Sequence, residues 1–203
     1  MNRTKKNTTI QILSLLFLMA IVLFLLINHD RITKPKPIQK TGFYFNTVIS
    51  VQLNDTDDTT LLDGCFALAD RYEHLFSRTL PDSEIYAINH ADGKPVTVSD
   101  ETIELLKLGK EFGELSEGRF DITIGALSSL WDIPNNTDTI PSSEAIKAAL
   151  STVDYKQIQI TGNTVTLRNP DTQIDLGGIA KGYLADGIKG VCSDVLIEST
   201  LDD

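Results

Sequence analysis

The chain has 203 residues with 18 Lys and Arg against 28 Asp and Glu, a formal net charge of −10. The charge is unevenly divided, because residues 1–40 hold seven basic residues and one acidic residue, which leaves a net charge of −16 on the remainder. So acidic a body excludes nucleic acid as an expected partner, since phosphate backbones bind basic surfaces. The length accommodates one domain once a targeting segment is set aside.

The N-terminal segment predicts a membrane anchor. Residues 1–9 are basic, and residues 10–27 are almost unbroken apolar sequence, interrupted only by Gln11 and Ser14. A helix needs about 20 apolar residues to cross the hydrocarbon core. A cleaved signal peptide is the alternative, but residues 28–31 offer no small-residue cleavage site, so we favour an uncleaved anchor.

Residues 28–40 are expected to form a linker, in which the Lys-Pro-Lys-Pro sequence of residues 34–37 predicts a stiff, extended spacer. The globular domain is then expected over residues 41–203. Basic residues on both sides of the apolar run leave its orientation open on charge alone.

Periodicity and turn signals predict the elements of this domain in chain order. They are a strand over 43–53, helices over 61–76, 83–90 and 99–118, a turn and short helix over 122–131, a polar loop over 135–141, a helix from Ser142, hairpin strands over 154–160 and 165–167, and a strand over 174–176 followed by a helix to Cys192. Antiparallel strands and helices in alternating groups predict the α+β class.

Cys65 and Cys192 are the only cysteines. Cys65 lies on the apolar face of a predicted helix, where a small core residue is the expected role. Their spacing does not match a metal site, and we do not expect a disulfide between them. The three histidines likewise lack partners at ligand spacing.

The most informative stretch is residues 174–184, which read IDLGGIAKGYL. An acid, Asp175, precedes a Gly-Gly turn, after which a helix presents Lys181 in its first turn. Such a turn lets backbone N–H groups approach a ligand, and a helix N-terminus with a lysine favours phosphate. Taken alone, the same sequence is also compatible with a tight strand–helix connection in which Asp175 caps the helix and Lys181 is an exposed surface residue.

Other blocks accompany this stretch in a distinctive order. They are NTVISV at residues 46–51, Ser77 followed by PDSEI at 81–85 and Asn89, and GRFDITIG at 118–125 followed by Leu-Trp at 130–131. In this order and spacing, residues 41–191 resemble the FAD:protein FMN transferase family, often called ApbE proteins. The G-x-F-D-x-T-x-G and D-L-G-G-I-A-K-G-Y blocks carry the resemblance most specifically.

The resemblance implies an ApbE-like α+β fold and a site for FAD and magnesium. It places Asp175 and Lys181 at FAD, makes the backbone carbonyl of Gly178 a magnesium ligand, and lines the flavin with the block that contains Arg119, Phe120 and Asp121. By residue type alone, Phe120 would be a core residue and Asp121 a cap for the next turn. No catalytic residue is assigned.

Three positions depart from the family pattern. Phe45 and Thr79 stand where other members often carry methionine and an aromatic residue, and Arg119 stands where a small residue is common. Phe45 and Thr79 are retained as cofactor-binding candidates by position.

The last residues depart further. Residues 195–203 match none of the expected family sequence, and the later Asp and Thr that complete the magnesium site are not found. We therefore expect the chain to be the N-terminal part of the fold, with little or no transferase activity from residues 41–203 alone.

Three functions remain open. The first is a magnesium-dependent transferase that attaches FMN from FAD to a Thr or Ser hydroxyl of an acceptor protein, such as a subunit of a membrane redox complex. The second is a truncated relic that is inactive or only binds flavin, and the third is hydrolysis of FAD to FMN and AMP. In each case the resemblance implies a globular part outside the cytoplasm, held at the cell membrane.

Overall fold

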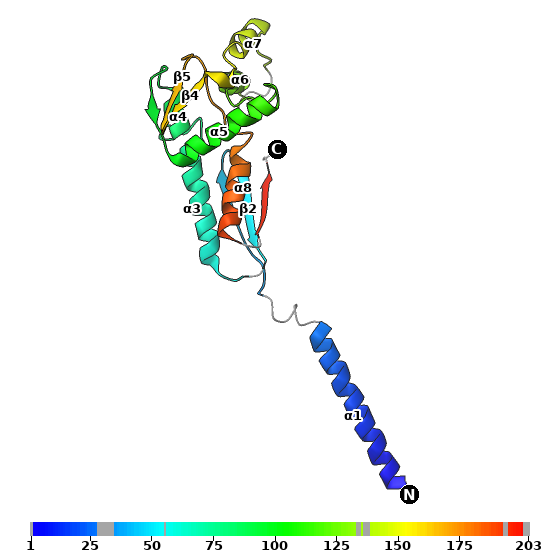
Figure 1. The fold of residues 1–203 in the computed structure, drawn as a ribbon. Helices are drawn as coiled ribbons and strands as arrows, with labels where there is room; N and C mark the ends of the chain where they lie inside the picture. The colour runs from blue at the N-terminus through cyan, green and yellow to red at the C-terminus, as the bar shows by residue number, and fades with distance from the viewer. Residues whose placement is uncertain are drawn as a thin grey trace.

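The computed structural model describes residues 2–27, 35–54, 56–132, 135, 139–192 and 195–200, with side chains described from Leu13 on and up to Cys192. Figure 1 shows an α+β body in which helices and two small antiparallel sheets occupy two neighbouring regions. The predicted fold class is therefore confirmed.

The first sheet has the strand order β1-β2-β6 and is antiparallel throughout. Strand β1 (Ile38–Tyr44) pairs with β2 (Thr47–Leu53), which pairs with β6 (Val195–Thr200). The single predicted strand over 43–53 is thus wrong, because a two-residue turn at Phe45 and Asn46, both with φ of 55°, divides it into a hairpin. Strand β1 also begins inside the predicted linker, and β6 was not predicted.

Two helices pack beside this sheet and against each other (Figure 1). Helix α3 (Thr59–Phe76) begins where Asp58 accepts a hydrogen bond from the backbone of Thr60, and it buries one apolar face. Helix α8 (Ala180–Val191) lies against α3. The rings of Tyr72 and Tyr183 pack together in this contact, with centroids 5.3 Å apart.

The second sheet has the order β3-β5-β4 and lies among the remaining helices. Its members are β3 (Val96–Thr97), β4 (Ile158–Thr161) and β5 (Thr164–Leu167), preceded by the 3₁₀ turn η1 (Tyr155–Gln157). The helices are α4 (Glu84–Asn89), α5 (Asp100–Leu115), α6 (Gly125–Trp131) and α7 (Ser143–Leu150). Ser83, Ser99 and Ser142 cap α4, α5 and α7, as the sequence predicts for such positions.

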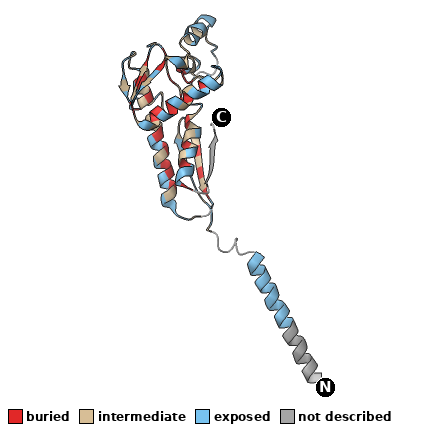
Figure 2. Cartoon of the chain, in the orientation of Figure 1, coloured by how far each residue is buried: buried red, intermediate tan, exposed pale blue. Residues whose placement is uncertain are grey.

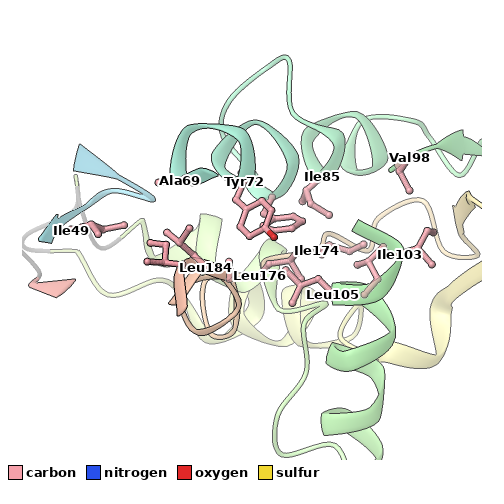
Figure 3. Packing of buried hydrophobic residues seen from close by; sticks show 14 of the residues in the cluster. Ile49, Ala69, Tyr72, Ile85, Val98, Ile103, Leu105, Ile174, Leu176 and Leu184 are labelled. Atoms are coloured by element: carbon pink, nitrogen blue, oxygen red, sulfur yellow. The ribbon is translucent and has the colours of Figure 1, made fainter. Parts of the chain in front are cut away.

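One hydrophobic core joins the two regions. Buried residues follow the inner faces of the helices and sheets in Figure 2. Figure 3 shows Ile49 toward one end of this core and Val98 and Ile103 toward the other, with Tyr72 and Leu176 between them. The described sheets and helices therefore stabilise each other through this core.

Helix α1 spans Asn2–Ile27, and its described side chains, from Leu13 to Ile27, are exposed. Among the described residues, none of the helices combines the length and apolar character needed to cross a membrane. The predicted membrane anchor over residues 10–27 is therefore not supported by the structure.

Candidate functional site

Two hollows meet at Asp175 and Gly177, which line both of them. The first has a volume of about 190 Å³ and is bounded by the β1–β2 turn, the end of α3 and the start of α8. The second has a volume of about 310 Å³ and is bounded by residues 119–121 and the start of α6. The fold thus brings the sequence blocks singled out above to one place.

The backbone around Asp175 is held by residues far away in the sequence. The Asn89 side chain donates to the carbonyl of Ile174 at 2.9 Å and accepts from its N–H at 2.7 Å, and the N–H of Asp175 donates to Ile122 O at 2.8 Å. The segment 174–176 is not the predicted strand. In the described part of the chain, the nearest strand-like pairing is an isolated bridge between Ile124 and Gln173, the residue before the segment, and the Asn89 side chain occupies the backbone groups of Ile174.

The carboxylate of Asp175 is shared between the turn and a cation. Its Oδ1 accepts from the N–H of Gly177 at 2.8 Å, and its Oδ2 lies 3.1 Å from Nε of Arg78. The first contact closes the turn before α8 and does not cap the helix, whose N-cap residue is Ile179. Arg78 also donates to Ser129 Oγ at 2.9 Å. The side chains of Arg78 and Asp175 are 27% and 20% exposed, respectively, so a ligand in either hollow can reach this ion pair.

Arg78 was missed by the sequence reasoning, although it stands between Ser77 and Thr79, both of which were noted. The available signal was its charge, because Arg78 is a basic residue beside two positions of the family pattern in a strongly acidic body. Since Arg78 links the loop after α3 to α6, it joins the walls of the two hollows.

Phe45 and Thr79 line the first hollow, as their predicted cofactor role requires. Phe45 has a left-handed backbone, φ of 55°, and its N–H donates to the Glu73 carboxylate at 2.8 Å. A left-handed conformation is unfavourable for a bulky residue, so this hydrogen bond helps to hold it. Thr79 is exposed, and its N–H donates to Ser77 Oγ at 3.3 Å.

Arg119, Phe120 and Asp121 line the second hollow. Arg119 is exposed, and the half-buried ring of Phe120 packs edge-on against Phe112 at 6.0 Å. Asp121 is engaged by the protein itself, since its Oδ1 accepts from the N–H and hydroxyl of Thr123 and its Oδ2 from the N–H of Tyr155. Its described contacts are therefore those of a structural cap, which was the role expected from residue type alone.

Gly178 lines the second hollow and lies against the Phe120 ring, where an added Cβ would be 3.1 Å from Cε2. Ile179 precedes α8 without a side-chain cap, and the N–H of Ala180 donates to Leu176 O at 2.8 Å, so an acceptor could reach only the later N–H groups of the first turn. Lys181 is in that turn but is not among the residues that line either hollow, and its ammonium makes no ion pair with any residue that the structure describes.

The fit to magnesium is incomplete. Magnesium prefers oxygen ligands in near-octahedral arrangement. Asp175 and the carbonyl of Gly178 offer such oxygens, but the described residues contain no group of three or more His, Cys, Asp or Glu side chains that could hold a metal ion. The described part of the chain therefore does not form a complete metal site by itself.

The ApbE family model matches residues 45–201, which is most of the chain and includes every candidate site residue. The chain belongs to the ApbE family. Its membership explains why the blocks around Phe45, Ser77, Asp121 and Asp175 converge, and it confirms the resemblance that these blocks indicated.

Curated ApbE relatives carry the name FAD:protein FMN transferase. One from Klebsiella pneumoniae is 33% identical over 147 residues, covering 71% of this chain and 46% of the relative. Another, from Chlamydia pneumoniae, is 31% identical over 183 residues, covering 87% of this chain and 57% of the relative. The chain thus spans about half the length of the curated relatives that it matches.

The solved ApbE protein of Thermotoga maritima has a similar fold, with a TM-score of 0.72 at 28% identity. The similarity covers 81% of this chain and 57% of that protein. The ApbE-like α+β fold is therefore shown for the globular part of the chain.

Proposed function

We propose that this protein is a magnesium-dependent FAD:protein FMN transferase that acts at the two hollows around Asp175. In this reaction a Thr or Ser hydroxyl of an acceptor protein attacks the FMN phosphorus of FAD, and AMP leaves. The observation that carries the proposal is the convergence of the two most specific family blocks, because Asp175 and Gly178 line the same hollow as Phe120 and Asp121.

The charges at the site suit a dinucleotide. The body is strongly acidic, so a pyrophosphate needs local cations, and Arg78 and Arg119 line the first and second hollows. The start of α8 adds positive charge at the first hollow, which Ala180 lines, and Lys181 follows in the first turn of this helix. Phe120 offers an apolar ring for a flavin, and the glycines at 177 and 178 let backbone approach the ligand closely.

Magnesium would neutralise charge that develops on the transferred and leaving phosphates. The donors present are the carbonyl of Gly178 and the carboxylate of Asp175, one oxygen of which already faces Arg78. We propose that these two residues contribute oxygens to the metal site.

The proposal is tested by incubating the purified chain with FAD, magnesium and a flavin-acceptor domain, and detecting covalent FMN by in-gel fluorescence. Labelling that requires both FAD and magnesium would support transfer and overturn the expectation of low activity. Binding of FAD without labelling would favour the flavin-binding-only alternative. A chain that neither binds FAD nor labels the acceptor would contradict the proposal.

Lys181→Ala is expected to weaken FAD binding by about 1–2 kcal/mol, because it removes a charge-assisted contact to phosphate. Isothermal titration calorimetry with FAD measures the effect. Lys189→Ala is the matched control, since it removes the same charge from the last turn of the same helix, where Lys189 lies 3.9 Å from Asp186. Equal losses in both variants, or none in Lys181→Ala, would remove Lys181 from the site.

The acceptor is proposed to be a flavoprotein such as a membrane redox-complex subunit. The location of the globular part at the outer side of the cell membrane stays a prediction. Cell fractionation followed by protease treatment of intact cells would test it.

A further inference from the structure

The two cysteines meet inside the core. Cys65 is fully buried on α3, Cys192 is 8% exposed at the end of α8, and their Sγ atoms are 3.8 Å apart although the residues are 127 positions apart in the chain. Both are free thiols in this structure. The sequence did not predict this contact, because it depends on how α3 and α8 pack.

The surroundings of the pair do not suit metal binding, nor, for Cys65, nucleophilic catalysis. No third His, Cys, Asp or Glu joins the thiols in a metal-binding group among the residues that the structure describes. The pKa of Cys65 is raised to about 11 by burial and by its contact with Cys192. Since the thiolate is the nucleophile, this buried thiol is poorly suited to catalysis at neutral pH.

The geometry favours a bond between the two sulfurs. The two sulfurs of a disulfide are about 2.0 Å apart. The Sγ atoms, which are now 3.8 Å apart, would therefore need to approach each other by less than about 2 Å. Cys192 has already left the helix, with extended backbone angles of −134° and 133°, so its side chain can turn without disturbing the helical hydrogen bonds before it. The helices themselves are fixed nearby, because Gly187 of α8 packs against Leu68 and Tyr72 of α3.

We propose that Cys65 and Cys192 form an intramolecular disulfide that ties the end of α8 to α3. The oxidant is a protein or small-molecule disulfide that takes part in thiol–disulfide exchange. One cysteine thiolate attacks this disulfide and forms a mixed disulfide, and the second cysteine thiolate then displaces the reduced oxidant. The Cys65–Cys192 bond forms, the oxidant leaves as two thiols after accepting two electrons, and the two cysteine protons are taken up by the released thiolates or by water.

The bond would stabilise the helix pair that carries the candidate site. Cys65 and Cys192 lie at one end of the α3–α8 contact, and Phe76 and Tyr183, with ring centroids 5.7 Å apart, lie at the other. The second end adjoins Ser77, Arg78 and Ala180, which line the first hollow. Because burial shields both sulfurs, the bond should form during folding and resist reductants once the protein is folded.

The test refolds the purified full chain from denaturant in oxidised glutathione or in a reductant. After oxidative refolding, we expect denatured protein to bind no maleimide, its intact mass to be two hydrogens lower, and its Tm to be roughly 5–15 °C higher than that of the reduced form. Folded oxidised protein should keep the bond in a reductant concentration that cleaves it in urea.

Cys65→Ala and Cys192→Ala are the matched controls. Neither variant can form the intramolecular bond, so its Tm should be the same after refolding in oxidised glutathione and in reductant, apart from any change caused by glutathione bound to the remaining thiol. Two free thiols in wild-type protein after oxidative refolding would overturn the proposal, as would disulfide-linked dimers or a lower Tm on oxidation. Maleimide labelling of the wild-type protein decides the question even if a variant does not fold. The result does not depend on whether the chain binds FAD.

Discussion

Asp121→Ala is expected to destabilise the protein by about 3 kcal/mol. The half-buried carboxylate accepts from Thr123 N at 2.8 Å, Thr123 Oγ1 at 2.6 Å and Tyr155 N at 2.9 Å. Thr123 is itself buried and accepts from Asp154 N, so the substitution removes the centre of a small network and leaves donors without acceptors. Hydrogen bonds to a charged group contribute about 1.5–3 kcal/mol each and are not additive. Urea unfolding followed by circular dichroism gives the free energy.

Asp121→Asn is the matched variant, because it preserves the shape and one acceptor oxygen, and it should lose less than half as much stability. FAD affinity measured on both variants separates the two roles of this residue. If Asp121→Ala keeps its stability but loses FAD binding, Asp121 acts as a flavin contact, and its assignment as a structural cap is wrong.

Gly125→Ala is expected to destabilise the protein by about 2–3 kcal/mol and to weaken FAD binding. A Cβ at this position would lie 2.7 Å from the carbonyl oxygen of Gln173 and 2.9 Å from its carbonyl carbon. These are backbone atoms, so no side-chain rotation relieves the clash, and overpacking of this kind costs about 1–3 kcal/mol. The N–H of Gly125 also donates to Gln173 O at 2.9 Å, so the clash would move the segment that leads to Asp175.

Gly64→Ala is the control for Gly125→Ala. Gly64 lies within α3, where nothing would meet an added Cβ within 4 Å. Alanine there should be neutral or stabilise the helix by up to about 1 kcal/mol, because it restricts the unfolded chain and has a higher helix propensity. Thermal unfolding and FAD titration compare the two variants. Equal stability of both would show that the chain adjusts at Gly125, and the contact with Gln173 would then not position the site.

Local patterns in the sequence were sufficient to predict where the helices lie. The apolar spacing from Leu61 to Phe76 and the capping serines at 83, 99 and 142 predicted α3, α4, α5 and α7 close to their observed bounds. The information for a helix lies within the segment itself, in its period and its caps. The hairpin at Gly162 was predicted for the same reason, apart from the turn η1 at its start.

Strands were less predictable, because each depends on its partner. The turn at Phe45 and Asn46 contains neither glycine nor proline, so the β1–β2 hairpin looked like one strand. The segment 174–176 looked like a strand but is bound by the Asn89 side chain, from 85 positions earlier in the chain. Strand β6 was not predicted, because residues 195–203 matched none of the expected family sequence. The strand is defined by its pairing with β2.

The features of the candidate site likewise fall into those that the sequence predicted and those that only the structure shows. The sequence by itself determined the family and the residues that carry it, because the blocks around Asp121 and Asp175 are specific in type and order. Only the tertiary structure decided that Asp121 accepts a hydrogen bond from Tyr155, that Arg78 faces Asp175, and that the thiols of Cys65 and Cys192 touch. These are contacts between residues 34 to 127 positions apart, and they are fixed by the packing of helices and loops around one core, which no local pattern in the chain specifies.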